Sequence, residues 1–517
     1  MEELTPRRKR LVLATLCATM FMAMLDNVVV NNALPRIGRQ LHAGVDGLQW
    51  IVEGYSLVYA ALLLTGGTLG DRYGRKRIFL TGLALFTAGS AAAGLSWSTG
   101  PLIAARMLQG LGAALLTPGS LSVLRHVFTD ERERARAVGL WSGVSALGLA
   151  VGPVVGGPIV EAFGWSGVFW INVPVGAAGL LLAARALPEF AGRARRLDLA
   201  GQALSALGLG ALVYALVEGP THGWTERGVP ACAAAAALLL PLFALVELRT
   251  ADPMLDLRFF RDPALTAAAL SGFMVSFGIF GTSFFLPLLM QDVMGWAPSD
   301  AGLAGLPMTA MIVVAAPLSG ALTARRGPRP PLVTGLALCA ASLAGLSAYG
   351  EQARYPQYLW VLLAMGLGMG MTFTPVSITV MQRVDPARAG MASATVNTLR
   401  ELGGVVGVAV LGAVLTSRLA GVPTGSPDLL GVPPEQRHPV PGPAAGALAA
   451  GPGDTLPQAL RDAADAAFVD GLHLALRCGA AALAVAAVLV AVLLRRAPAA
   501  PSPAAGRPVP AAEPVGR

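Results

Sequence analysis

Apolar stretches long enough to cross a lipid bilayer follow one another along most of this 517-residue chain. A spanning helix needs about 20 predominantly apolar residues. Only 13% of the residues are charged, whereas a soluble protein has about 25%. The pattern therefore predicts an all-α polytopic membrane protein and excludes a soluble enzyme. Fourteen stretches are expected to span the membrane: 11–34, 48–70, 78–97, 101–124, 137–160, 167–187, 197–218, 229–248, 265–291, 299–324, 331–349, 356–381, 389–417 and 471–494.

The distribution of basic residues predicts the orientation of these spans. With a cytoplasmic N-terminus, the inner segments hold 28 of the 38 basic residues and the outer loops hold seven. An excess of Lys and Arg is typical of cytoplasmic loops. We therefore expect an even number of spans with both termini in the cytoplasm. The net charge of +8 then reflects membrane topology, and nucleic acid is not expected as a partner.

Several classes of function lack their sequence signatures. Lys9 and Lys76 are the only lysines, so the chain has no GxxxxGK[ST] phosphate loop and is not itself an ATP-driven pump. The four cysteines lie alone in apolar stretches, without a CxxC pair or a His-rich neighbourhood, so neither a metal site nor a cofactor is expected. The spans hold no HExxH motif and no Ser-His-Asp candidate, so we expect no enzyme activity.

Short motifs recur at a nearly constant offset. TPGS at 117–120 recurs as TPVS at 374–377, and GxLxxRxG at 67–74 recurs at 320–327. The offset corresponds to eight spans, so the simplest arrangement is two six-helix halves separated by an inserted pair. Two like halves around a central site form a transporter architecture.

This arrangement predicts four regions. They are an N-terminal half at 1–190, an inserted helix pair with its flanks at 191–255, a C-terminal half at 256–496, and a disordered cytoplasmic tail at 497–517. Within the C-terminal half, residues 421–470 are rich in Pro, Gly and Ala and are expected to form a long outer loop.

Four motifs resemble those of the major facilitator superfamily, specifically its fourteen-span drug:proton antiporters, and the resemblance covers essentially the whole chain. GTLGDRYGRKR at 67–77 matches the inner-loop motif, and GLAVGPVVGG at 148–157 matches the fifth-span antiporter motif. RMLQGLG at 106–112 resembles the fourth-span motif, and LDNVVVNNALP at 25–35 resembles the first-span motif. The chain departs from the family pattern at Val28, at Asn32, and in 165–172, where an aromatic-Arg-aromatic run is usual.

The resemblance implies a two-half helical fold whose spans one and four line a cavity. It implies proton-coupled export of amphipathic drugs or an antibiotic across the bacterial inner membrane. The expected partners are a small-molecule drug, protons and the lipid bilayer, and the expected unit is a monomer. Two alternatives stay open. A proton-coupled uptake symporter is disfavoured by the fifth-span motif, and a non-transporting sensor is disfavoured because no soluble output domain is present.

Three charged residues are expected at similar depth in the outer third of the membrane. At 1.5 Å per residue, Asp26 lies ~12 Å deep, and Glu53 and Arg106 each lie ~8 Å deep. A charged group inside the bilayer costs ~3 kcal/mol on insertion scales, which indicates a function or a partner. Asp26 is expected to exchange the proton, with Glu53 and Asn31 in support. The alternatives are a purely structural Asp26–Arg106 ion pair and a Glu53 that reaches the membrane surface.

Arg400 and Glu401 are expected near the midplane in the thirteenth span. Adjacent residues on a helix diverge by about 100° and do not face each other. Each is therefore expected to have another partner or to face the cavity, and a structural and a substrate-binding role stay equally open.

The inner loop after the second span contains Gly67, Asp71, Arg72, Gly74 and Arg75. Asp71 lies at the C-terminal end of a helix, where the helix dipole disfavours an anion. The negative charge of Asp71 must therefore be balanced by Arg72, by Arg75 or by the N-terminus of a neighbouring helix. Gly74 permits a tight turn, and Gly67 permits close helix contact. The resemblance implies that this loop holds the two halves together when the cavity faces outward.

Glycines recur every four residues in the fifth span, at Gly148, Gly152 and Gly156. Such a stripe lets another helix pack closely, and Pro153 is expected to bend the helix. With Gly157 in register, the resemblance implies a hinge that seals the two halves against leak.

Overall fold

The computed structural model describes residues 5–190, 198–226, 228–250, 253–350, 355–384, 389–420 and 458–496. These residues form helices and connecting turns, without a strand. Thirteen helical segments are long and apolar enough to cross a membrane, and the bent α5 makes fourteen, which confirms the predicted fold class. The elements are α1 (Pro6–Leu41), α2 (Val45–Tyr73), α3 (Arg75–Gly94), α4 (Thr99–Val127), α5 (Glu131–Phe163), α6 (Gly167–Trp170), α7 (Asn172–Ala186), α8 (Leu199–His222), α9 (Gly228–Arg249), η1 (Leu257–Arg261), α10 (Pro263–Leu288), η2 (Leu289–Val293), α11 (Pro298–Leu303), α12 (Leu306–Arg326), α13 (Arg329–Leu346), α14 (Tyr355–Arg383), α15 (Ala389–Ala420) and α17 (Gln458–Arg496).

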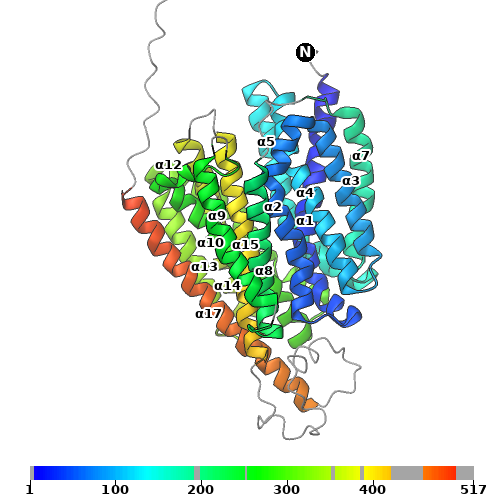
Figure 1. Ribbon diagram of the computed structural model, residues 1–517, viewed down its shortest axis with the longest axis vertical. Coiled ribbons are helices and arrows are strands. Elements are labelled where there is room, and N and C mark those ends of the chain that lie inside the picture. Colours follow the sequence, from blue (N-terminus) through cyan, green and yellow to red (C-terminus); the bar gives the residue numbers. More distant parts are fainter. Residues whose placement is uncertain are drawn as a thin grey trace, which may run out of the picture.

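The helices form two groups with the same pattern of neighbours (Figure 1). In the first group α4 packs against α2 and α3, and α1 packs against α5. In the second group α14 packs against α12 and α13, and α10 packs against α15. Helices α8 and α9 pack against each other, and α8 contacts both α2 and α15. The tertiary packing thus repeats at the eight-span offset that the sequence motifs indicated.

Close helix crossings recur at equivalent places in the two groups. A Cβ atom on Gly82 of α3 would lie 2.7 Å from the carbonyl oxygen of Gly112 on α4. A Cβ on Gly335 of α13 would lie 2.8 Å from the carbonyl oxygen of Gly368 on α14. Both crossings require glycine, because backbones in a membrane approach this closely only where side chains are absent.

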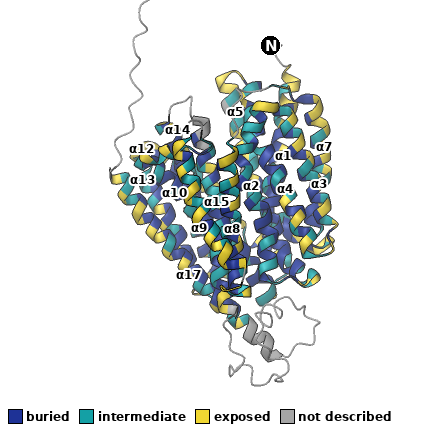
Figure 2. Cartoon of the chain, viewed as in Figure 1, coloured by how far each residue is buried: buried dark blue, intermediate teal, exposed yellow. Residues whose placement is uncertain are grey.

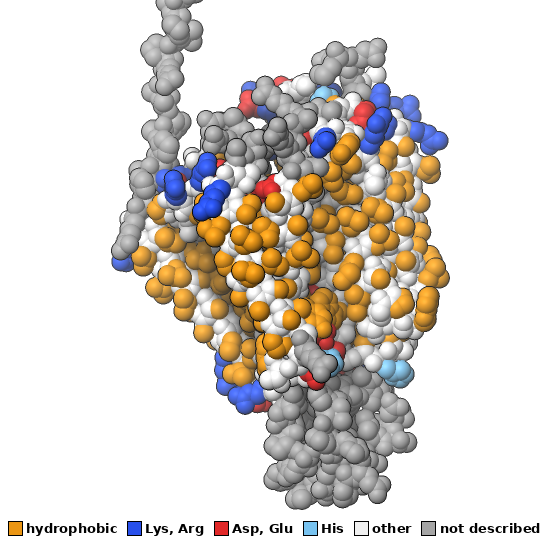
Figure 3. Space-filling model, viewed as in Figure 1, with side chains coloured by type: hydrophobic (Ala, Val, Ile, Leu, Met, Phe, Trp, Pro, Cys, Tyr) orange, Lys and Arg blue, Asp and Glu red, His pale blue; other side chains and the backbone are white. Residues whose placement is uncertain are grey.

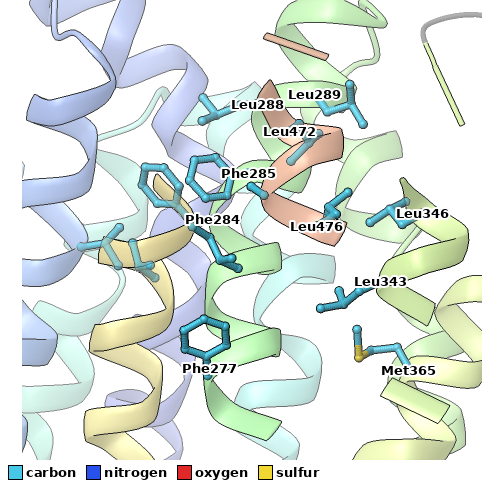
Figure 4. Close-up of a cluster of buried hydrophobic side chains, with 14 of the residues drawn as sticks. Phe277, Phe284, Phe285, Leu288, Leu289, Leu343, Leu346, Met365, Leu472 and Leu476 are labelled. Carbon is cyan, nitrogen blue, oxygen red and sulfur yellow. The ribbon is translucent and has the colours of Figure 1, made fainter. Parts of the chain in front are cut away.

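A large apolar cluster fills the interior of the second group, where α10 packs against α13 and α17, and it continues into the first group. Phe277, Phe284 and Phe285 of α10 lie beside Leu476 of α17 and Leu343 of α13 (Figure 4). Buried residues occupy the interior of both groups, whereas exposed residues lie along the outward faces of the peripheral helices (Figure 2). This is the distribution expected when lipid and not water covers the outside.

The molecular surface has an apolar band between two polar ends. In the view of Figure 3, most visible Lys and Arg side chains gather at the top, above a broad hydrophobic band. The start of α1 and the end of α17 both lie toward that end (Figure 1). The topology predicted from the basic residues makes this end cytoplasmic.

The outer loop expected at 421–470 is shorter than predicted, because α17 already begins at Gln458. The sequence changes there from a Pro- and Gly-rich stretch to one with several alanines, and Ala has the highest helix propensity. The remainder of that loop, 421–457, and the expected tail at 497–517 lie outside the described residues.

Candidate functional site

Asp26 of α1 is fully buried and accepts three hydrogen bonds. Its Oδ2 accepts from Arg106 Nη1 of α4 at 2.6 Å. Its Oδ1 accepts from Asn172 Nδ2 of α7 at 2.6 Å and from Gln109 Nε2 of α4 at 3.2 Å. A buried carboxylate is costly unless it is paired and hydrogen-bonded. Asp26 meets both conditions, and it joins three helices of the first group.

Arg106 is the largest fully buried side chain among the described residues. Its Nε donates to the carbonyl oxygen of Ile51 at 3.2 Å, and its Nη1 also donates to Gln109 Oε1 at 2.9 Å. Its guanidinium lies 4.5 Å from the ring centroid of Tyr55 and 5.8 Å from that of Phe169. Such contacts with aromatic faces stabilise a desolvated cation. The Asp26–Arg106 pair is thus held on every side by the protein.

Glu53 of α2 is also fully buried, but neither of its carboxylate oxygens has a hydrogen-bond partner among the described residues. The alternative in which Glu53 reaches the membrane surface is therefore wrong. Asn31, the further residue expected in this layer, is buried as well, and its Oδ1 lacks a partner within the described chain. The two acids that the sequence placed at similar depth thus differ in their surroundings. Asp26 is fully hydrogen-bonded, whereas Glu53 is isolated.

Glu53 lies at the junction of α2, α8 and α15. Gln49, one turn before it, donates to the carbonyl oxygen of Val408 on α15 at 3.2 Å. Trp50, three residues before it, and Leu57, four residues after it, pack in an apolar cluster with α8 and α15. Residues three and four apart share a helix face. The face of α2 that carries Glu53 is therefore the face that meets the inserted pair and the second helix group.

Arg400 and Glu401 of α15 form an ion pair with each other, with Arg400 Nη2 lying 3.0 Å from Glu401 Oε1. The expectation that adjacent residues would need separate partners is wrong, because both side chains are long enough to bend toward one another. Arg400 also lies 5.7 Å from the ring centroid of Phe373 on α14.

The inner loop is organised within the first helix group. Asp71 pairs with Arg75, one of the three partners considered for it. Gly74 ends α2 with φ 105°, a conformation that favours glycine, while Arg72 lies over the ring of Tyr73 at 5.4 Å. The close helix contact expected at Gly67 falls one residue earlier. A Cβ on Gly66 would lie 2.1 Å from the carbonyl oxygen of Ala114, whereas one on Gly67 would meet only Pro118 at 3.6 Å.

The glycine stripe of α5 packs against α1 of the same group. Cβ atoms on Gly148, Gly152 and Gly156 would lie 2.7 Å from Phe21 O, 2.3 Å from Val28 Cγ2 and 2.8 Å from Val29 Cγ2, respectively. The helix bends by 44° between Leu149 and Val151. The bend lies where Pro153 leaves the carbonyl of the residue four positions earlier without its helical donor.

Only the end of this motif reaches the second helix group. A Cβ on Gly157 would lie 2.3 Å from the carbonyl oxygen of Pro298 on α11, and one on Gly302 would lie 2.2 Å from that of Pro153. The residues for which the family resemblance implies a hinge thus pack mainly against α1, with a short extension to α11.

Polar contacts also join the two groups at the end opposite the inner loop. Arg39 Nη1 of α1 lies 2.9 Å from Asp292 Oδ1 in η2, and the Asp292 side chain is 8% exposed. Gln291 Nε2 of η2 donates to the carbonyl oxygen of Asn32 on α1 at 3.1 Å. We refer to these interactions as the outer contact.

Sequence reasoning missed Gln109, Asn172 and Asp292 as site residues. Asn32 and Asn172 were noted only as departures from the family pattern, yet each bonds to a motif residue. A polar residue in an apolar span indicates a buried hydrogen bond. The sequence does not show the partner, because the partner lies on a helix distant in the chain. Among the described residues, no group of three His, Cys, Asp or Glu side chains could hold a metal ion.

Residues 16–408 match the sequence model of the Major Facilitator Superfamily. The chain is 40% identical to the multidrug resistance protein Stp of Mycobacterium tuberculosis (strain CDC 1551 / Oshkosh), over 83% of this chain and 80% of that protein. It is 36% identical to the tetracenomycin C resistance and export protein of Streptomyces glaucescens, over 92% of this chain and 90% of that protein. A bacterial homolog of the human lysosomal transporter Spinster, solved in an inward-facing and unoccupied conformation, has the same fold, with a TM-score of 0.67 and 18% identity over 95% of this chain and 98% of that chain.

Proposed function

The chain belongs to the major facilitator superfamily, and we propose that it exports amphipathic drugs or an antibiotic from a bacterial cell in exchange for protons. Relatives with 40% and 36% identity are named, respectively, for multidrug resistance and for tetracenomycin C resistance and export. The apolar band and the repeated two-group packing fit a transporter in the inner membrane that works by alternating access. Both termini would lie in the cytoplasm.

The observation that carries proton coupling is the contrast between the two buried carboxyl groups. Asp26 has three donors, one of them a cationic Arg106, so its ionised form is stabilised. Glu53 has no partner among the described residues, and an isolated buried carboxylate costs several kcal/mol even after relaxation. Glu53 is therefore the better candidate to carry a proton in this conformation. Sequence reasoning assigned that role to Asp26, which we now regard as a fixed anion that positions Arg106.

The position of Glu53 links its protonation to conformational change. A neutral Glu53 can remain between α2, α8 and α15, whereas its ionised form needs water or a cation. Loss of the proton would therefore favour separation of α2 from α15, which belong to different helix groups. A proton that enters down a membrane potential of 100 mV releases ~2.3 kcal/mol. Export would use this energy if the proton leaves Glu53 only when the junction opens toward the cytoplasm.

The test is expression in a bacterium that lacks its own drug pumps, with a compound panel that includes ethidium and tetracenomycin C. The wild type should raise resistance to at least one compound and lower its accumulation in the cell. In everted vesicles, that compound should release lumenal protons through the wild type, whereas Glu53→Gln should bind it without a proton signal. Increased accumulation in cells would favour uptake and contradict export. Full coupling in Glu53→Gln would return the proton-carrying role to Asp26.

A further inference from the structure

The inserted helix pair contacts the proposed proton site through Glu218 of α8. Trp50 Nε1 of α2 donates to Glu218 Oε1 at 2.7 Å, and the Trp50 and Tyr214 rings lie 6.2 Å apart. The other oxygen of Glu218, Oε2, lies 2.9 Å from Nδ1 of His222, one turn later on α8. Glu218 thus connects an exposed histidine with the face of α2 that carries Glu53.

These three titratable side chains become progressively less exposed toward Glu53. The exposed fraction falls from 58% at His222 to 17% at Glu218 and to 0% at Glu53. Helices α2 and α8 run antiparallel, because Trp50 near the start of α2 meets Glu218 near the end of α8. The Cα–Cβ bonds of a helix tilt toward its N-terminus. Glu53 therefore leans toward the end where His222 lies, and Glu218 leans toward the depth of Glu53.

On its other side Glu53 is closed off by apolar packing. Leu57 and Ala60 of α2 form a buried cluster with Val213 of α8 and with Val405 and Ala409 of α15. This apolar cluster lies on the inner side of Glu53, whereas Glu218 and His222 lie toward the outer end of α8.

Other charged groups lie on the helices packed around α2. Helix α15 carries Arg418 near its outer end and the Arg400–Glu401 ion pair about two turns before Val408, the backbone partner of Gln49. Helices α1 and α4 carry the Asp26–Arg106 pair. Helix α2 itself carries Asp46 in its first turn and Asp71 and Arg72 at its other end, and α9 carries Glu247 and Arg249 at the end away from Glu218. Among the described residues, the hydrogen-bonding partners of Glu218 are Trp50 and His222.

We propose that His222 and Glu218 deliver protons from the outer side to Glu53, so that the inserted pair takes part in energy coupling. The proposal rests on the proposed antiport function. The imidazolium of His222 transfers its Nδ1 proton to the Glu218 carboxylate. The resulting carboxylic acid passes its proton to the Glu53 carboxylate through an intervening water, because the Glu53 oxygens have no hydrogen-bond partner among the described residues. The neutral imidazole then takes up a proton from outer water. One proton thus moves from outer water to Glu53, and Glu218 and His222 return to their starting states.

The test uses three variants of the full-length protein in proteoliposomes, with ethidium as the transported probe and outer pH as the variable. Glu218→Gln keeps an acceptor for the Trp50 indole but carries no exchangeable acid. His222→Gln removes the exposed proton collector. Trp50→Phe is the matched control, because it breaks the α2–α8 hydrogen bond and leaves all three titratable groups in place.

The Glu218→Gln variant should move protons roughly 100-fold more slowly than the wild type at neutral outer pH, the lower end of what a positioned proton carrier contributes. The deficit should shrink at acidic outer pH, where protons are more abundant. The His222→Gln variant should show the same pH dependence with a smaller deficit, and Trp50→Phe should match the wild type. Equal losses in Trp50→Phe and Glu218→Gln would overturn the proposal in favour of a structural tether.

The same assay separates failure of this proposal from failure of the proposed function. If the wild type binds ethidium but moves no protons with it, antiport itself is wrong for this substrate. If the wild type couples and Glu53→Gln does not, but Glu218→Gln and His222→Gln couple at the wild-type rate at every outer pH, the proton route is wrong and antiport stands. Because His222 is largely exposed, its variant remains informative even if Glu218→Gln does not fold.

Discussion

At the scale of single residues, the surroundings of a carboxyl group decide its chemistry more than its depth does. Asp26 and Glu53 are both fully buried in the first helix group. Arg106, Gln109 and Asn172 surround Asp26 with donors, whereas Glu53 has none among the described residues. We expect the fully hydrogen-bonded Asp26–Arg106 pair to stay together when the helices move. We expect the protonation of the isolated Glu53 carboxyl group to change when the helices around it separate.

This contrast predicts effects of very different size from two amide substitutions on stability. Asp26→Asn leaves the Arg106 cation buried without its counter-ion, and breaking a buried pair costs about 3–5 kcal/mol. Glu53→Gln should change stability little, because it replaces one neutral group with another. Thermal unfolding of the purified protein, followed by tryptophan fluorescence, measures both. The double variant Asp26→Asn/Arg106→Gln should recover part of the loss, and equal destabilisation by the two single variants would contradict our assignment.

At the scale of helices, the contact between α1 and α5 depends on missing side chains. The glycines at 148, 152 and 156 bring α5 against the backbone and small side chains of α1. Close packing of this kind stabilises helix association through van der Waals contacts. These contacts matter in a membrane because lipid tails are as apolar as the side chains, so the hydrophobic effect contributes little between helices. The tightness of this contact holds α1, and with it Asp26, in position.

Two alanine substitutions on α5 test that contact. A Cβ on Gly148 would lie 2.7 Å from the carbonyl oxygen of Phe21, whereas one on Gly143 would meet nothing within 4 Å. Gly148→Ala should therefore lower both the unfolding temperature and transport. Gly143→Ala should keep transport and gain up to about 1 kcal/mol from its better helix propensity. Comparable transport in the two variants would show that close α1–α5 packing is dispensable.

The outer contact between the two groups gives a second prediction at this scale. Arg39 and Asp292 join α1 to η2, so Asp292→Asn should weaken closure at this end. A cysteine placed beside the pair should then react faster with a membrane-impermeant thiol reagent. The charge swap Arg39→Asp/Asp292→Arg should restore the slow reaction. An unchanged rate in Asp292→Asn would mean that the hydrogen bond from Gln291 to Asn32 holds this end without the ion pair.

At the scale of the whole molecule, the repeated packing and the basic residues make one combined prediction about topology. With an even number of spans, both termini should lie in the cytoplasm and the segment around residue 440 should lie outside. Reporter fusions at that segment and at the C-terminus should therefore give opposite signals. Identical signals at both sites would exclude the fourteen-span arrangement.

The sequence alone determined the fold class, the number of spans and the family. These properties depend on the length of apolar runs, the spacing of glycines and prolines, and the side of the membrane on which arginines lie, all of which are local in sequence. The bend at Pro153 and the turn at Gly74 were predictable for the same reason, because each reflects the backbone of one residue.

Only the tertiary structure decided which buried groups are paired. Asn172 reaches Asp26 across 146 positions, and Gln49 reaches Val408 across 359. Depth estimates placed Glu53 beside the Asp26–Arg106 pair, but its direction on the helix points it toward α8 and α15 instead. The pairing of Arg400 with Glu401 likewise depended on side-chain conformations that helix spacing does not fix. Hydrogen-bond partners are set by how helices face one another in three dimensions, and no pattern within a single helix records that.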